Sequence, residues 1–156
     1  MNTKPTEVVK ELLENTAPDK VDEASSRLIA EDLIYVSLNF DNPELKRILP
    51  WTGTSKGQYT LSDTFKKVAK FWTIEDFNVA SLFGQGEDVA VFGEFTYRSK
   101  TTDKAFRSPF AIHAKVRDGK VVSFLFMEDT FASARSFSTG GTWTVNTELQ
   151  PQPYEV

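Results

Sequence analysis

The sequence predicts an α+β fold in which a strongly curved antiparallel sheet forms a cone packed on N-terminal helices. Two short amphipathic helical patterns come first, and four long strand-like segments joined by tight turns follow between residues 74 and 130. The segment Leu49-Pro50-Trp51-Thr52-Gly53-Thr54 lies between these parts and leads into a third helical pattern. Because such a sheet encloses a hollow, we expect any ligand site to lie on its concave side.

Apolar spacing places the three helices. The first begins near Pro5, a residue suited to a first helical turn, and its apolar side is formed by Val8, Val9, Leu12 and Leu13. Asp19 is the expected N-cap of the second, whose repeat is Val21, Ala24, Ser25, Leu28 and Ile29. The third is expected at 62–72, with a buried stripe of Phe65, Val68, Ala69 and Trp72.

The strands are indicated by β-forming residues and by turn signals. Residues 33–40 predict a first strand, and residues 43–59 are expected to be loop. Four further strands are expected at 74–83, 89–99, 105–117 and 120–130. Asp118-Gly119 is a strong two-residue hairpin signal, so it fixes the register of the last two strands.

The composition is that of one ordinary soluble domain. The chain has 156 residues, 40% of them apolar and 26% charged, with a formal charge of −4 and no basic stripe. This pattern argues against a nucleic-acid partner. No apolar run is long enough to span a bilayer, and charges in the first helical pattern argue against a signal peptide. We therefore expect a cytoplasmic protein without membrane contact.

The chain is rich in aromatic residues and lacks cysteine. Thirteen Phe, four Tyr and three Trp make up 13% of the residues, which indicates a dense core or an aromatic-lined cavity. The absence of Cys excludes disulfides, thiolate metal ligands and thiol nucleophiles. His113 is the only histidine, and it has no His or Cys partner for a zinc site. No metal and no organic cofactor are expected.

The Asp118-Gly119 hairpin assigns side chains to the two faces of the sheet. Arg117 is expected to pair with Lys120, and the antiparallel pairing is expected to continue residue by residue along both strands. This register puts an apolar row with one carboxylate on the concave face. With the preceding hairpin added, this row consists of Phe95, Tyr97, Ser108, Phe110, Ile112, Ala114, Val116, Val121, Ser123, Leu125, Met127 and Asp129.

The convex face would then carry Phe92, Phe124 and Phe126 near its middle. A monomer has little reason to expose three phenylalanines on one sheet face, so we expect this face to be a homodimer interface. The alternative is that the C-terminal tail covers it. On the same face, His113 is expected to contact solvent or the dimer partner.

Several of these features together resemble the SnoaL-like, ketosteroid-isomerase-related branch of the nuclear-transport-factor-2-like superfamily. They are the order of elements, the Leu49–Gly57 segment, the hairpin Val116-Arg117-Asp118-Gly119-Lys120-Val121 and the closing Met127-Glu128-Asp129-Thr130. The resemblance covers residues 5–135. It implies a cone of the cystatin-like type, usually dimeric, with a hydrophobic pocket between sheet and helices.

The chain departs from the family pattern at two positions. Ketosteroid isomerases use an Asp base late on the first strand together with a Tyr and a protonated Asp, and the two Asp positions correspond here to Ser37 and Ile112. Steroid isomerase activity is therefore not expected. The pocket His of many SnoaL-like cyclases also corresponds to Ile112, whereas the acid at the end of the last strand is kept as Asp129.

Asp129 is the candidate catalytic residue of the sequence. A carboxyl in an apolar cone would have a raised pKa, which suits a general acid or base near neutral pH. The alternative is that Asp129 caps the chain reversal before Phe131 or binds a backbone amide. The candidate ligand-binding residues are Tyr35, Ser37, Asn39, Trp51, Trp72, Phe95, Tyr97, Phe110, Ile112 and Met127. Of these, Trp51 is expected to close the pocket mouth.

Residues 1–135 are expected to form the cone domain and residues 136–156 a C-terminal tail. Thr142-Trp143-Thr144-Val145 alternates like an edge strand, so the tail could join the sheet, reach across a dimer or be a disordered end. Three functions stay open. The first is an acid–base enzyme of isomerase, cyclase or hydrolase type acting on a small apolar molecule through Asp129. The others are a non-catalytic binding or sensing domain and a dimeric interaction module.

Overall fold

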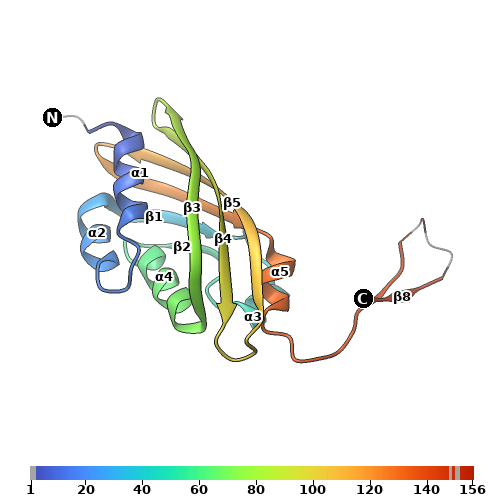
Figure 1. Ribbon diagram of the computed structural model, residues 1–156. Helices are drawn as coiled ribbons and strands as arrows, with labels where there is room; N and C mark the ends of the chain where they lie inside the picture. Colours follow the sequence, from blue (N-terminus) through green and yellow to red (C-terminus); the bar gives the residue numbers. More distant parts are fainter. Residues whose placement is uncertain (1–2, 148, 150–151) are drawn as a thin grey trace.

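The computed structural model describes residues 3–147, 149 and 152–156. Its helices and strands follow one another in an α+β order (Figure 1). The order is α1 Pro5–Glu14, α2 Val21–Leu28, β1 Ile29–Ser37, α3 Pro43–Ile48, β2 Gly53–Lys56, α4 Thr60–Phe71, β3 Trp72–Gln85, β4 Asp88–Ser99, β5 Ala105–Arg117, β6 Lys120–Glu128, α5 Thr130–Arg135, β7 Thr144–Val145 and β8 Tyr154–Glu155.

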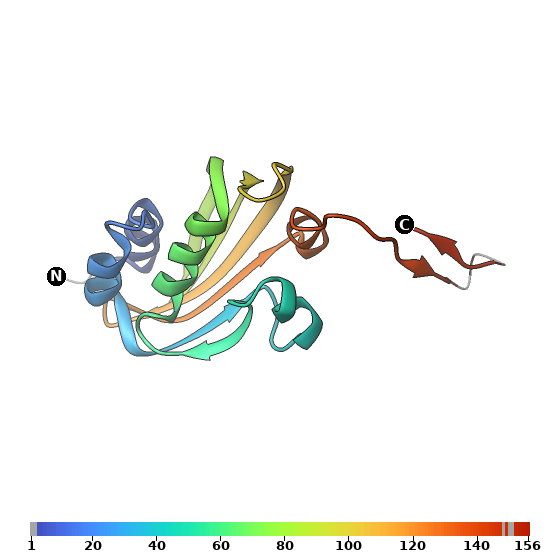
Figure 2. The same ribbon diagram turned by 90° about the horizontal axis from the view of Figure 1, so that it is seen from below.

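One six-stranded sheet forms the body of the molecule, in the order β2-β1-β6-β5-β4-β3. All neighbours in it are antiparallel except β1 and β6, which run parallel. The sheet curves strongly, and α1, α2 and α4 lie against one of its faces (Figures 1 and 2). The predicted cone fold is therefore confirmed, and the side of the sheet that faces these helices is called its inner face below.

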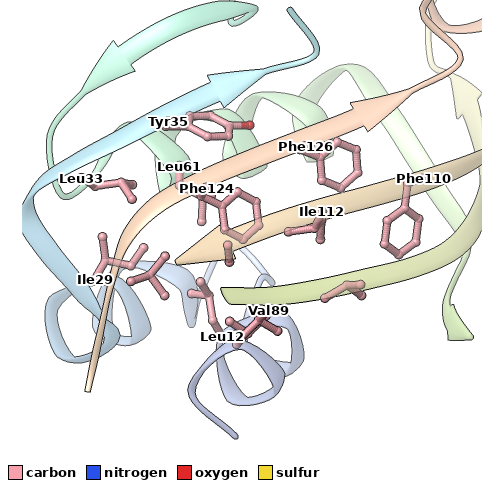
Figure 3. Packing of buried hydrophobic residues seen from close by; sticks show 14 of the residues in the cluster. Leu12, Ile29, Leu33, Tyr35, Leu61, Val89, Phe110, Ile112, Phe124 and Phe126 are labelled. Carbon is pink, nitrogen blue, oxygen red and sulfur yellow. The ribbon is translucent and has the colours of Figure 1, made fainter. Parts of the chain in front are cut away.

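The core fills the space between the inner face and the helices. Figure 3 shows Leu12 of α1 and Leu61 of α4 near side chains of β1, β4, β5 and β6. Val9, Leu12, Leu33 and Leu61 are fully buried, as are Phe95 and Phe124 to within 1%. Burial of this apolar surface is the main stabilising contribution to the fold.

The segment expected to be loop contains a helix and a strand, so that prediction was wrong. Asn42 caps α3, because its side-chain Oδ1 accepts a hydrogen bond from the amide of Leu45 at 3.0 Å, and Pro43 fits the first turn. Gly53–Lys56 then pairs with β1 as an edge strand. A further difference is that Trp72 begins β3 and does not belong to the preceding helix.

A β-bulge in β6 reverses which of its later side chains face inward, compared with the prediction from a regular hairpin. Val116 pairs with Val121, but Lys115 pairs with Ser123, so Val122 is an extra residue. From there on, the alternation is shifted by one residue. Phe124, Phe126 and Glu128 therefore face inward, whereas Met127 is on the outer face with 49% of its surface exposed.

The outer face consequently carries fewer phenylalanines than predicted. Phe92 is 47% exposed, as expected, but Phe124 and Phe126 are buried and that part of the prediction was wrong. Phe83 of β3, which is 57% exposed, stacks on Phe92 with ring centroids 6.1 Å apart. The exposed apolar pair of this face is thus Phe83 and Phe92.

The chain leaves the body after the short helix α5. The described residues after Ser138 are called the C-terminal arm here, and they extend away from the sheet (Figures 1 and 2). Within the arm, β7 pairs with β8 and not with an edge of the cone. None of the helices in the described ranges combines the length and the apolar character that crossing a membrane requires.

Candidate functional site

Three ionisable side chains meet on the inner face of the sheet. Tyr35 comes from β1, Tyr97 from β4 and Glu128 from the last position of β6. Their positions follow from the register, since Tyr35 pairs with buried Phe124, Tyr97 with Phe106 and Glu128 with buried Phe110. Residues directly opposite in a ladder share a face. Figure 3 shows Tyr35, Phe124, Phe126 and Phe110 along one side of the sheet.

Glu128 has the most perturbed carboxyl of the described residues. Burial among the surrounding aromatic side chains raises its pKa to about 7, and the charge of Asp129 raises the pKa further, while the Ser133 hydroxyl opposes the shift. A carboxyl with a pKa near neutrality exists in both protonation states in the cell. It can therefore donate or accept a proton under the same conditions.

Tyr35 is held as a neutral phenol. Burial raises its pKa to about 12, the hydroxyls of Ser37 and Thr64 lower the pKa, and the charge of Glu128 raises it. Only 4% of the Tyr35 surface is exposed. Because its phenolate is disfavoured, Tyr35 can act as a hydrogen-bond donor at neutral pH but not as a base.

Tyr97 is in the same electrostatic situation. Burial raises its pKa above the usual range, and the charges of Glu128 and Tyr35 raise it further. Because these charge effects fall off with distance, they place the three side chains near one another. Tyr35, Tyr97 and Glu128 therefore form one coupled group, which is called the inner polar centre below.

Aromatic side chains surround the inner polar centre. Tyr97 lies 4.1 Å from Phe95 and 5.8 Å from Trp72 between ring centroids, and Phe110 stacks on Phe126 at 5.4 Å. Gly93 makes room for Phe110, since a Cβ at this position would lie 2.6 Å from its ring. Dry, apolar walls of this kind strengthen every hydrogen bond made between them.

Asn39 supplies a further polar group near the end of β1. Its side-chain nitrogen and oxygen are both buried, and neither has a hydrogen-bond partner among the described residues. The preceding residue, Leu38, has a positive φ of 69° and donates its amide to the carbonyl of Phe126. A buried amide of this kind can form hydrogen bonds with a water molecule or a ligand that lies beside it.

The mouth of the cone is closed by stacked rings. Trp51 stacks on Phe71 at 5.8 Å and meets Trp72 edge-on at 5.3 Å. Phe137, which follows α5, stacks on the other side of Trp72 at 4.8 Å. Only 6% of the Tyr97 surface is exposed to solvent in this arrangement.

A cleft of about 550 Å³ lies beside this plug, between α3, α5 and the C-terminal arm. Its wall is mainly apolar, with one acidic and one basic side chain. It is lined by Asn42, Glu44, Leu45, Ile48, Thr130, Phe131, Ala134, Arg135, Phe137, Ser138, Gly140, Gly141, Thr142, Trp143 and Val156. The volume is in the range of sites for small molecules.

The structure does not place Asp129 in the cone. Its Oδ1 accepts a hydrogen bond from the amide of Ala132 at 3.0 Å, so the side chain caps α5 and is exposed to solvent. The expected inward position was therefore wrong, and so was that of Met127. In both cases the reason is the one-residue shift at Val122.

The other expected ligand-binding residues lie in the interior or at its mouth. Buried are Tyr35, Ser37, Trp72, Phe95, Tyr97, Phe110 and Ile112. Trp51 lies at the mouth and Asn39 at the end of β1. Sequence reasoning missed Glu128, because no local sequence signal marks the extra residue Val122 that turns Glu128 inward.

His113 lies outside the site, as expected from its position. It is on the outer face, where its Nε2 lies 2.8 Å from Oδ1 of Asp88. Hydrogen bonding to His113 is the largest effect that lowers the pKa of Asp88. The pair is exposed to solvent and contributes little to stability.

No protein-family profile matches the chain. Two fungal relatives are similar to it over most of its length. Patulin synthesis protein F of Aspergillus clavatus is 40% identical over 128 residues, which cover 80% of this chain and 65% of the relative. Patulin biosynthesis cluster protein F of Penicillium expansum is 37% identical over 134 residues, 84% of this chain and 67% of the relative. The chain thus spans about two thirds of these proteins.

Solved structures show the same fold at lower identity. An NTF2-like protein from Burkholderia thailandensis has a TM-score of 0.72 and 20% identity, and the match covers 88% of this chain and 99% of that one. A candidate SnoaL-like polyketide cyclase from Jannaschia sp. has a TM-score of 0.69 and 12% identity, with 90% and 99% covered. These likenesses concern the fold.

Proposed function

Because the chain belongs to the same family as the patulin biosynthesis cluster protein F of Penicillium expansum and has the fold of NTF2-like and SnoaL-like proteins, we propose that it is an acid–base enzyme of the isomerase or cyclase type. Its relatives are named for patulin biosynthesis, and a role in a biosynthetic reaction fits this proposal. The observation that carries the proposal is Glu128, a carboxyl with a pKa of about 7 beside two buried phenols.

Glu128 is the proton carrier of the proposed reaction. In its ionised form it removes a proton from the carbon next to a substrate carbonyl, and the C–H electron pair becomes part of an enolate. In its protonated form it returns that proton to a different carbon of the conjugated system, so substrate and product are isomers and the enzyme is regenerated. General acid–base catalysis of this kind contributes about 10²- to 10⁴-fold to a rate.

Tyr35 and Tyr97 stabilise the enolate oxygen. Both remain protonated at neutral pH, because burial and the charge of Glu128 raise their pKa values. Each phenol can donate a hydrogen bond to the oxygen on which negative charge develops. Asn39, whose amide is buried and unpaired among the described residues, can orient a second oxygen of the substrate.

The proposal is tested by hydrogen exchange on carbon. Pooled cyclic ketones and enones are incubated with the protein in D₂O, and NMR measures the loss of C–H signal. Glu128→Gln keeps the shape of the side chain and removes the base, so we expect at least about a 10²-fold loss of exchange rate. Asp129→Asn is the matched control, because Asn is an equally good N-cap. It removes a charge that raises the pKa of Glu128 but leaves the base in place, so the rate should fall far less than in Glu128→Gln.

A binding protein without turnover is the second candidate, and it is favoured by Ile112, which stands where the related enzymes carry a second acid or a pocket His. It predicts that wild-type protein binds ketones but does not speed their exchange. Exchange that is equal in the wild type and Glu128→Gln would contradict the enzyme proposal and leave the binding function.

A further inference from the structure

Two side chains separate the cleft from the aromatic interior. Leu45 of α3 and Phe137, just after α5, both line the cleft and both pack against the buried core. Phe137 is the larger of the two, and its ring lies against Trp72 at 4.8 Å and against Phe71 at 6.5 Å between centroids. The cleft and the core therefore share a wall that is one side chain thick at this point.

Phe137 is fixed by a hydrogen-bonded latch at the preceding residue. The indole Nε1 of Trp72 donates to Oγ of Ser136 at 2.9 Å, and this hydroxyl donates to the carbonyl of Ser133 at 2.6 Å. Thr102 and Lys104, from the turn between β4 and β5, donate to the carbonyls of Ser136 and Ser138. The segment after α5 is thus attached to the body through side chains, which can release it without breaking the sheet.

Trp72 connects this latch to the inner polar centre. Its ring lies 5.8 Å from that of Tyr97 and 5.8 Å from that of Phe106. The rings of Phe137 and Trp72 both lie between the cleft and Tyr97. Movement of Phe137 away from the core would remove its stacking on Trp72, and loss of the bond to Ser136 would free the indole of Trp72 to move as well. Phe137 is thus the side chain that both lines the cleft and contacts Trp72, which in turn contacts Tyr97.

We propose that this cleft is the entrance vestibule of the inner polar centre and that Phe137 is its gate. The inference rests on the proposed function, because it assumes that a substrate reaches Tyr35, Tyr97 and Glu128. It adds a binding site outside the cone, formed by α3, α5 and the C-terminal arm, where a small molecule stays before the gate opens.

The lining selects a neutral, planar molecule. Its large side chains are aromatic or aliphatic, with Phe131, Phe137 and Trp143 as the aromatic ones. Glu44 and Arg135 carry opposite charges, and the Arg135 guanidinium lies over the Phe131 ring at 5.5 Å. Inside the cone, the inner faces of β4, β5 and β6 present no Lys or Arg, so an anion would find no partner there.

The route is tested with 2-naphthol, a neutral planar phenol. The chain has three tryptophans, so the protein labelled with ¹⁵N at the indoles gives three resolvable N–H signals. We expect 2-naphthol to shift the signals of Trp143, in the cleft, and of Trp72, behind the gate. Stopped-flow fluorescence of 2-naphthol measures the rate of the slow step that follows cleft binding.

Variants separate the gate from the rest of the cleft. Phe137→Ala is expected to speed the slow step about tenfold, because one stacked aromatic side chain no longer has to move. Ser136→Ala, which removes the latch and keeps the ring, should act in the same direction if Phe137→Ala does not fold. Phe131→Ala is the control, since it should weaken cleft binding and leave the slow step unchanged.

The proposal is overturned if 2-naphthol does not bind, if Trp72 responds while Trp143 does not, or if neither gate variant changes the slow step. Carbon exchange, measured separately from 2-naphthol binding, distinguishes this failure from that of the proposed function. Normal 2-naphthol kinetics without carbon exchange in the wild type would refute the enzyme and keep the vestibule. Carbon exchange in the wild type, together with a slow step that neither Phe137→Ala nor Ser136→Ala changes, would refute the vestibule and keep the enzyme.

Discussion

Glu128 and Asp129 are neighbours in the chain but face different surroundings. Glu128 lies on the inner face of the sheet opposite Phe110, whereas Asp129 turns to solvent and accepts a hydrogen bond from the amide of Ala132 at 3.0 Å. The strand ends between the two residues, so one carboxyl is desolvated and the other caps a helix. Four predictions follow from this and from the surrounding structure.

Replacing Asp129 tests its role as a cap. Asp129→Ala removes the acceptor for the Ala132 amide and is expected to lower the free energy of unfolding by about 1 kcal/mol. Asp129→Asn keeps the acceptor and should change that free energy by only a few tenths of a kcal/mol. Urea denaturation followed by circular dichroism measures both. Equal losses in the two variants would show that the charge of Asp129, and not its capping bond, is what stabilises the fold.

The pH dependence of stability reports the burial of Glu128. Its pKa is raised from an ordinary value of 4.5 to about 7, so between these values the folded protein binds more protons than the unfolded chain. The free energy of unfolding contributed by this group is therefore fully present below pH 4.5 and is lost as the pH rises through 7. Urea titrations at several pH values should show the decline in the wild type.

Glu128→Gln is the control for this prediction, because glutamine does not titrate. Its stability, relative to that of the wild type, should rise across the same pH window. Parallel curves for the two proteins would mean that Glu128 has an ordinary pKa in the folded state and is not desolvated.

Gly93 should not tolerate a side chain. An alanine Cβ at this position would lie 2.0 Å from the carbonyl oxygen of Asn78 and 2.6 Å from the Phe110 ring. Gly93→Ala is therefore expected to lower the free energy of unfolding by about 3 kcal/mol or more, as overpacking against the backbone does. Gly140→Ala is the control, since nothing lies within 4 Å of its added Cβ. Similar thermal midpoints for the two variants would contradict the close approach of the strands at Gly93.

The outer face of the sheet is proposed as a homodimer surface. Phe83, near the end of the edge strand β3, and Phe92 of the neighbouring β4 are 57% and 47% exposed and stack on one another. Phe92→Asp should convert a dimer to a monomer in sedimentation experiments, because a charge would be buried without a partner. Phe40→Asp is the matched control, since Phe40 is 76% exposed and lies after β1, outside this pair. A wild-type monomer at all concentrations would refute the dimer.

Sequence patterns predicted most of the fold, because helices and hairpins are encoded locally. The spacing of Val8, Val9 and Leu12 predicted α1, and Asp118-Gly119 fixed the turn between β5 and β6. Residues 43–59 were harder, because a six-residue helix and a four-residue edge strand are too short to show a period.

The site was predicted less well, for a physical reason that involves one residue. Phe124, Leu125, Phe126 and Met127 are all apolar, so alternation alone does not show which of them face inward. The choice depends on the extra residue Val122, whose bulge is visible in the pairing of β5 with β6 but is not marked by a turn residue or a glycine in the local sequence. Tyr35 and Tyr97 lie before this point in the chain and were placed correctly on the inner face.

The parallel pairing of β1 with β6 affects the order in which the parts of the protein can fold during synthesis. A nascent chain on the ribosome exposes β1 long before residues 120–128 are synthesised, and until then this strand has only the short β2 beside it. Closing so long a loop carries an entropic cost that local hairpins do not have. Tyr35 can therefore meet Glu128 only after β6 has been synthesised, and a nascent fragment that ends before β6 contains α1 to α4 but not the inner polar centre.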